Sequence, residues 1–190
     1  MKDSDQKVIA VFGASRRAEG SPLYAEAYEV GRLLAQAGYA VMSGGYGGSM
    51  GAVSRGAAEA GGRVIGITCA IFDPLLGNAW LTEEAKTPTL IARLEALMEG
   101  AHGYVALRGG IGTLSEVTLA WSLLQTRSMS GKPLVLLGRE WQGVVDAFRA
   151  YTDLGHSIAA LARIIATPAE LPGALATPTP PTPPGPPPIG

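Results

Sequence analysis

The sequence predicts an α/β fold: a Rossmann-like, doubly wound parallel sheet with helices on both faces, built as a single domain. Three observations point to it. Short apolar runs alternate with longer helical segments along the chain, and these runs are apolar almost continuously rather than at every second position. Many of the 26 glycines follow such a run directly, where a strand would turn into a helix. Near-continuous apolar strands alternating with helices are typical of a parallel sheet covered on both faces.

The strands are predicted from short β-branched runs that end at a glycine or a turn. The first, VIAVF, lies between a lysine and a glycine and has the composition of a strand buried on both faces. Residues 68–88 contain two X–Pro pairs and no clear periodicity, so we expect an irregular connection there. The expected strands are residues 7–13, 39–45, 63–68, 103–107, 132–138 and, at an edge of the sheet, 162–166.

The helices are predicted from helical periodicity and from residues that favour helix ends. Ser21 and Pro22 suit the N-cap and first position of the first helix, and Gly38 suits its C-terminal end. The second helix consists mostly of small residues and should pack closely against its neighbours. The expected helices are residues 23–38, 49–62, 89–101, 113–125 and 141–155, with a short helical turn near 168–171.

Length and composition allow one domain and a tail. The chain has 190 residues, of which 47% are apolar, enough for one hydrophobic core. We expect the domain to comprise residues 1–172. Residues 173–190 are rich in proline and glycine without apolar periodicity, which predicts a disordered tail, in our interpretation a solvated spacer rather than a ligand of a proline-binding partner.

Charge and composition argue against several classes of function. The net charge is −1 and aromatic residues make up 6%, so neither a general affinity for nucleic acid nor a stacking surface for single strands is expected. The first apolar run is short and ends in glycine, unlike a signal peptide or a spanning helix, so we expect a cytoplasmic protein without membrane contact. The single cysteine and the two isolated histidines favour neither a disulfide framework nor a metal site.

Three glycine-bearing loops follow predicted strands and run into predicted helices: GASRRAEGS, SGGYGGSMG and RGGIGT. Helix N-termini attract anions, and glycine lets a phosphate approach the backbone closely. None of the loops is a dinucleotide-binding fingerprint or a Walker A loop. Each alone is best explained as a tight turn, but three in one sheet favour a phosphate-bearing small molecule.

The third loop also carries a T-x-x-E pattern, formed by Thr113 and Glu116. These residues could form a capping box at the start of a helix. Alternatively, the carboxylate of Glu116 could hold the hydroxyls of a ribose or polarise a water molecule beside the phosphate. The spacing alone does not distinguish the two.

The stretches SGGYGGSMGAVSRGAAEAGGRVIGIT and ALRGGIGTLSEV resemble the LOG (Lonely Guy) family, long described as lysine decarboxylases and similar to a wider group that includes molybdenum-cofactor carrier proteins. The family signature P-G-G-x-G-T-x-x-E corresponds to residues 108–116, and the resemblance covers about residues 8–165. It implies a Rossmann-like homodimer that hydrolyses the N-glycosidic bond of nucleoside 5′-monophosphates, such as AMP or cytokinin nucleotides, without a metal or redox cofactor.

The resemblance also implies which residues form the site. Glu116 matches the catalytic glutamate of the family, and Arg93 its catalytic arginine; from its helical position alone, Arg93 would instead pair with Glu95 or Glu99 on a solvated face. The register of one substrate-binding glutamate is open between Glu83 and the adjacent Glu84. The expected substrate- and phosphate-binding residues are Ser15, Arg16, Gly44, Gly45, Glu83, Gly109, Gly110, Gly112 and Thr113.

Three positions depart from the family pattern. Leu94, Arg108 and Ser115 stand where family enzymes usually have lysine, proline and glutamate. These departures keep a second function open: a carrier or sensor that binds a phosphorylated ligand, molybdenum cofactor or a nucleotide, without turnover. Lysine decarboxylation is not expected, because no lysine stands in a motif for a pyridoxal Schiff base.

Overall fold

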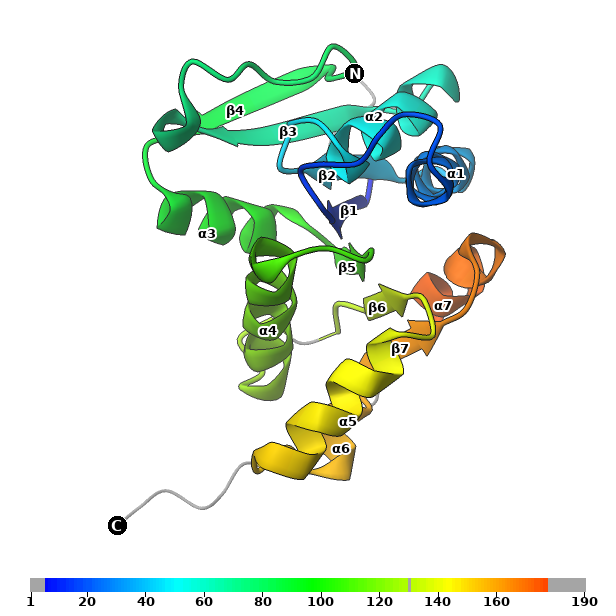
Figure 1. Ribbon diagram of the computed structural model, residues 1–190, viewed down its shortest axis with the longest axis vertical. Coiled ribbons are helices and arrows are strands. Elements are labelled where there is room, and N and C mark those ends of the chain that lie inside the picture. The colour runs from blue at the N-terminus through cyan, green and yellow to red at the C-terminus, as the bar shows by residue number, and fades with distance from the viewer. Residues whose placement is uncertain (1–5, 130, 178–190) are drawn as a thin grey trace.

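The computed structural model describes residues 6–129 and 131–177, and its centre is a seven-stranded, entirely parallel sheet (Figure 1). The strand order is β4-β3-β2-β1-β5-β6-β7, so the direction in which strands are added reverses between β1 and β5. This confirms the predicted Rossmann-like α/β fold. The strands are β1 (Val8–Phe12), β2 (Ala40–Ser43), β3 (Val64–Cys69), β4 (Glu83–Thr87), β5 (Gly103–Ala106), β6 (Leu134–Leu137) and β7 (Ala162–Ile165).

Helices cover both faces of the sheet, because successive strand side chains point to opposite sides. Ala10 and Phe12 pack with α3, α4 and α5, whereas Ile9 and Val11 pack with α1, α2 and α7. The helices of the described chain are α1 (Pro22–Gln36), α2 (Ser49–Glu59), α3 (Leu90–Gly100), α4 (Ile111–Gln125), α5 (Trp141–Tyr151), α6 (His156–Ala159) and α7 (Leu171–Ala176), with 3-10 turns η1 (Ala70–Phe72) and η2 (Pro168–Glu170). None of these helices has the length and apolarity needed to cross a membrane.

Glycines bring α1 and α2 together, as the small residues of the second helix predict. A Cβ built on Gly31 would lie 2.0 Å from the carbonyl oxygen of Val53, and one on Gly56 would lie 1.9 Å from that of Tyr28. Only residues without a side chain permit this approach of the two backbones. This packing fixes α2, which follows the second glycine loop, against α1.

The structure differs from the sequence-based prediction in several places, among them the unpredicted short helix α6. The expected irregular connection contains β4, an edge strand with exposed charged residues that pairs with β3. Helix α4 begins at Ile111, two residues earlier than expected. The expected boundary at residue 172 falls inside α7, which buries Leu171 and Leu175 in the core, so residues 173–176 belong to the folded domain. Residues 178–190, the rest of the predicted tail, lie outside the described residues.

Candidate functional site

The three glycine loops meet at the carboxyl edge of the sheet, around the point where the strand order reverses. The loops after β1 and β5 flank the gap between these neighbouring strands, and the N–H of Leu107 donates to the carbonyl of Phe12 (2.9 Å) just before both loops begin. The loop after β2 lies next to that after β1, since Ser49 N donates to the carbonyl of Ala14 (2.8 Å). Such a switch point is where open α/β sheets bind ligands.

Arg93 lies on α3 and is buried, with 7% of its surface exposed. Its Nε donates to the carbonyl of Ile67 at the end of the sheet (2.7 Å), and its guanidinium lies 5.9 Å from the centre of the Tyr46 ring. Its Nη1 faces Oε1 of Glu116 at 3.8 Å. The arginine therefore points into the carboxyl edge of the sheet and pairs with the glutamate of the third loop rather than with Glu95 or Glu99.

Gly44 makes room for this arginine. A Cβ built on Gly44 would lie 1.6 Å from Arg93 Nη2 and 2.7 Å from Sδ of Met50. Gly45 adopts a positive φ of 78°, and a Cβ there would lie 2.9 Å from Thr68. Both glycines are buried. The second loop thus determines where the guanidinium of Arg93 lies. The sequence did not indicate this role for Gly44 and Gly45.

Glu116 projects from the second turn of α4 and is 8% exposed. Burial raises the pKa of its carboxyl group to about 7, and the positive charge of Arg93 opposes this shift only in part. Among the described residues, Arg93 is the one charged partner of this carboxylate. A carboxyl group with a pKa raised by burial beside a single charged partner is a candidate for a functional residue.

The N-terminus of α4 is open. Its N-cap is Gly110, which provides no side-chain cap, and Thr113 lies inside the first turn, so Thr113 and Glu116 do not form a capping box. A Cβ on Gly110 or Gly112 would meet no atom within 4 Å, whereas one on Gly109 would lie 2.1 Å from Oγ1 of Thr113. The N–H groups of this first turn have no side-chain cap, and the glycines leave room beside them, so they form a cradle that suits an anion.

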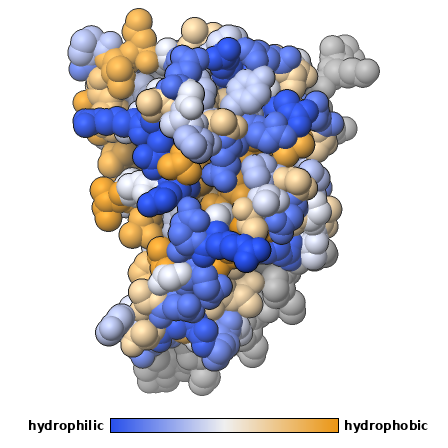
Figure 2. Space-filling model, turned by 45° about the vertical axis from the view of Figure 1, so that its right-hand side comes forward, coloured by the Kyte–Doolittle hydropathy of each residue, from blue (hydrophilic) through white to orange (hydrophobic). Residues whose placement is uncertain are grey.

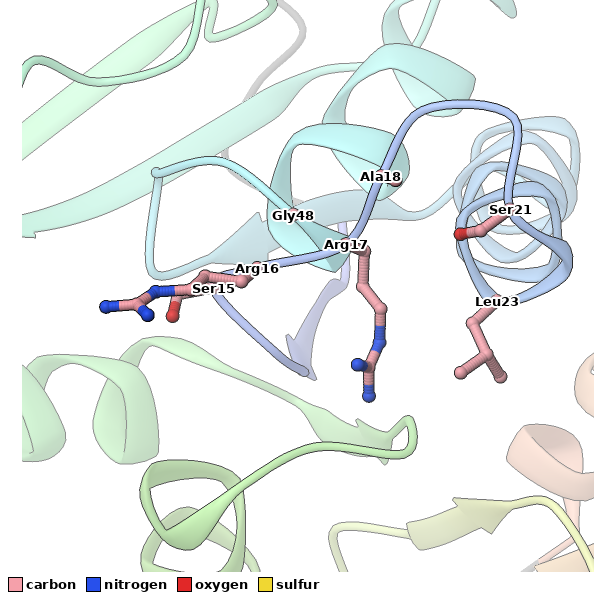
Figure 3. Close-up of a pocket in the computed structure, with 7 residues that line it drawn as sticks. All are labelled: Ser15, Arg16, Arg17, Ala18, Ser21, Leu23 and Gly48. Carbon is pink, nitrogen blue, oxygen red and sulfur yellow. The ribbon is translucent and has the colours of Figure 1, made fainter.

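The first loop borders an open pocket of about 550 Å³ (Figure 3). Ser15 and Arg16, both expected at the site, line it and are exposed. Arg17, which is not among the residues expected at the site, lines it too and donates from Nη2 to the carbonyl of Arg108 (3.3 Å). The one signal for Arg17 in the sequence was its position beside Arg16 in a loop after a strand.

Glu83 does not join the other expected residues. It lies at the amino end of β4, exposed, where its carboxylate pairs with Arg63 (Oε2 to Nη2, 2.8 Å). Its neighbour Glu84 points toward the second loop: it accepts a hydrogen bond from Oγ1 of Thr68 (2.6 Å), beneath Gly45. Of the two registers that the sequence left open, the structure brings Glu84 nearer to the site.

The departures from the family pattern leave the site intact. Arg108 is exposed, and its carbonyl accepts from Arg17. Ser115 donates to the carbonyl of Ile111 within α4, and Leu94 is half-buried on α3. Over the described residues, no group of three or more metal-binding side chains comes together.

Comparison with known proteins identifies relatives of this chain. The probable cytokinin riboside 5′-monophosphate phosphoribohydrolase LOG4 of Oryza sativa subsp. japonica is 30% identical over 177 residues, covering 90% of this chain and 75% of that protein. The cytokinin riboside 5′-monophosphate phosphoribohydrolase of Mycobacterium tuberculosis is 31% identical over 154 residues, 76% of each chain.

Solved structures share the fold. The molybdenum cofactor carrier protein of Chlamydomonas reinhardtii superposes with a TM-score of 0.68 at 27% identity, over 89% of this chain and 95% of that one. The molybdenum cofactor binding protein of Rippkaea orientalis gives 0.70 at 24% identity, over 88% and 94%, a likeness of fold alone. The model of the SLOG cluster4 family matches residues 6–158, and the chain belongs to that family.

Proposed function

We propose that the chain hydrolyses the N-glycosidic bond of a nucleoside 5′-monophosphate, AMP or a cytokinin nucleotide, to the free base and ribose 5-phosphate. The observation that carries this proposal is the buried pair of Arg93 and Glu116, 3.8 Å apart, beside the open N-terminus of α4. The names of the relatives from Oryza sativa and Mycobacterium tuberculosis support the reaction class.

Glu116 would act on the sugar. Cleavage of an N-glycosidic bond builds positive charge on the ribose ring, and a carboxylate held in a buried site stabilises that charge. The same carboxylate can orient a water molecule whose oxygen attacks C1′ as the C1′–N bond breaks. The electron pair of that bond stays with the base, and a proton released by the water neutralises it.

Arg93 would keep Glu116 ionised, and the glycine loop before α4 would bind the phosphate. Arg93 lowers the pKa of Glu116 against the effect of burial, which keeps part of the carboxylate ionised at neutral pH. The first turn of α4, with Gly110, Gly112 and Thr113, would bind the 5′-phosphate and fix the ribose over Glu116. Binding energy from the phosphate would then orient the reacting bond.

The test is chromatography of the products formed from AMP, other 5′-monophosphates and an isopentenyl-adenine nucleotide. Wild type should release free base, and Glu116→Gln should not. Glu95→Gln makes the same change of charge on the exposed side of α3 and serves as the matched control. Release of base by Glu116→Gln at the wild-type rate would refute the role of Glu116.

A carrier or sensor is the second candidate. It is favoured by the likeness to the Chlamydomonas reinhardtii carrier and by Leu94, Arg108 and Ser115, which replace residues usual in the enzymes. A carrier would bind a nucleotide or molybdenum cofactor through the same cradle without releasing base. Tight binding of AMP by wild type and Glu116→Gln alike, with no product from either, would favour this function.

We also propose a homodimer. Large apolar side chains are exposed on the elements that follow β3, β4 and β5, among them Leu76 (84%), Ile91 (73%) and Ile111 (81%). Figure 2 shows apolar side chains gathered at the upper left of the face in view. Exposed apolar groups of this size favour association.

Sedimentation at micromolar concentration should give a dimer for wild type and a monomer for Ile91→Lys. The matched control is Tyr151→Lys, which changes an equally exposed residue (88%) on α5. A monomeric wild type would overturn the proposal.

A further inference from the structure

Arg17 bridges the two loops that flank the switch point. It leaves the first loop, after β1, and its Nη2 reaches the carbonyl of Arg108 at the start of the third loop, after β5 (3.3 Å). Figure 3 shows its side chain pointing toward the loop after β5, while that of Arg16 extends to the left of the view. The guanidinium of Arg17 is therefore fixed beside the glycines that open α4.

The hydrogen bonding of Arg17 is incomplete. Its Nε is buried, and within the described part of the chain it has no hydrogen-bond partner. No carboxylate of the described residues lies within ion-pair distance of its guanidinium either. A guanidinium always carries its charge, and leaving one of its buried donors unpaired is costly. With no carboxylate of the described chain beside it, the charge of this guanidinium can be balanced by an anion that enters the pocket which Arg17 lines.

The loop that carries Arg17 is held in place on both sides. Ala14 accepts from Ser49 N at the start of α2 (2.8 Å), and Ser21 N donates to Ala18 (3.1 Å) before α1. Gly48 permits the closest approach, because a Cβ there would lie 2.4 Å from the carbonyl oxygen of Ala14. The pocket of about 550 Å³ beside Arg17 is thus bounded by anchored backbone and remains open on the outside.

From this geometry we infer that Arg17 determines specificity for a phosphate monoester: it binds the phosphate of the ligand from the first loop, opposite the first turn of α4. The inference rests on the phosphorylated ligand of the proposed function. A guanidinium suits this role because its fork of donors matches two phosphate oxygens at once, which a lysine cannot do. Nη2 can keep its bond to Arg108 while the other donors turn to the anion.

The test compares ligands that differ only in the phosphate. Calorimetry with ribose 5-phosphate and ribose, and with AMP and adenosine, is applied to wild type, Arg17→Gln, Arg17→Lys, Arg16→Gln and Arg149→Gln, and the thermal midpoint of each variant is measured. Arg149 lies on α5, where it contacts His156, and is the control for loss of an exposed arginine. Arg17→Gln should bind the phosphorylated ligands about 10- to 100-fold more weakly and leave adenosine binding unchanged. Arg17→Lys should recover part of the loss.

Several outcomes would overturn the inference. Arg17 does not bind the phosphate if Arg17→Gln keeps the wild-type preference for AMP over adenosine. The same holds if Arg16→Gln is the one variant that loses this preference. Equal loss of adenosine binding, or a thermal midpoint lowered as much by Arg17→Lys as by Arg17→Gln, would show a merely structural role. Ribose 5-phosphate binding separates this inference from the hydrolase: weaker binding by Arg17→Gln in a protein that cleaves no nucleotide supports Arg17 and refutes only the hydrolysis.

Discussion

The guanidinium of Arg93 occupies the space that a side chain at Gly44 would need, with Nη2 only 1.6 Å from the position of a Cβ. The glycine after β2 and the arginine on α3, far apart in the sequence, therefore depend on each other. Since Arg93 also bonds Ile67 and faces Glu116, any group added at Gly44 moves the arginine away from both. The second loop thus controls the geometry of the proposed catalytic pair.

We expect Gly44→Ala to lower turnover about 100-fold, because a shift of one ångström in a positioned group has effects of that size. Overpacking should also lower the free energy of unfolding by about 1–3 kcal/mol. Gly143→Ala is the matched control, since a Cβ there meets no atom within 4 Å and α5 should gain up to about 1 kcal/mol. Normal turnover in Gly44→Ala would show that hydrolysis does not depend on the present position of the Arg93 guanidinium.

The rate of hydrolysis should depend on the ionisation of Glu116. With a pKa of about 7 and the carboxylate as the active form, kcat/KM should rise with pH and level off above about pH 8. This rise of kcat/KM with pH should be absent in Glu116→Gln, whose turnover we expect to be about 10²- to 10⁴-fold lower. A profile that instead falls through pH 7 would assign Glu116 the role of a proton donor.

Removing the charge of Arg93 should shift the pH at which kcat/KM rises. In Arg93→Gln only burial acts on the carboxyl group, so the pKa of Glu116 should rise above its wild-type value. The rise of kcat/KM should then occur at higher pH. If the variant is too slow for kinetics, NMR titration of the Glu116 carboxyl carbon gives the same answer. An unchanged pKa would mean that the pair, 3.8 Å apart, is not electrostatically coupled.

Stability should respond to pH in the opposite sense to activity. The carboxyl of Glu116 holds its proton more tightly in the folded protein than in the unfolded chain, where the pKa is near 4.5. Folding is therefore penalised as pH rises from about 4.5 to about 7, and the full penalty, up to about 3 kcal/mol, remains above that range. Glu116→Gln should unfold at higher urea concentration than wild type at pH 8 and at nearly the same concentration at pH 4.

Most of the sheet could be predicted because its strands are apolar runs buried on both faces. β4 could not, because Glu83, Glu84 and Lys86 lie on an exposed edge where no apolar pattern is required. The start of α4 was predicted two residues late for a related reason. Its N-cap is Gly110, which has no side chain to cap the helix, whereas the hydroxyl of Thr113 could act as a cap and therefore favoured a start there.

Part of the candidate site could also be predicted from the sequence, and part could not. The family resemblance indicated Glu116 and Arg93, and the structure brings them together. The role of Gly44 and the bridge made by Arg17 depend on contacts between loops distant in the sequence, which no local pattern encodes.

The position of Glu83 allows a last prediction, on a residue that the family resemblance had placed at the substrate. Its carboxylate lies at the amino end of the exposed β4 and pairs with Arg63, so Glu83→Gln should change kcat and KM less than about twofold and stability by less than about 1 kcal/mol, as for surface ion pairs. Glu84→Ala removes the acceptor of Thr68 beneath Gly45, and we expect it to raise KM for AMP more than Glu83→Gln does. Steady-state kinetics of the two variants side by side decides between the registers, and a larger effect of Glu83→Gln would mean that β4 moves when substrate binds.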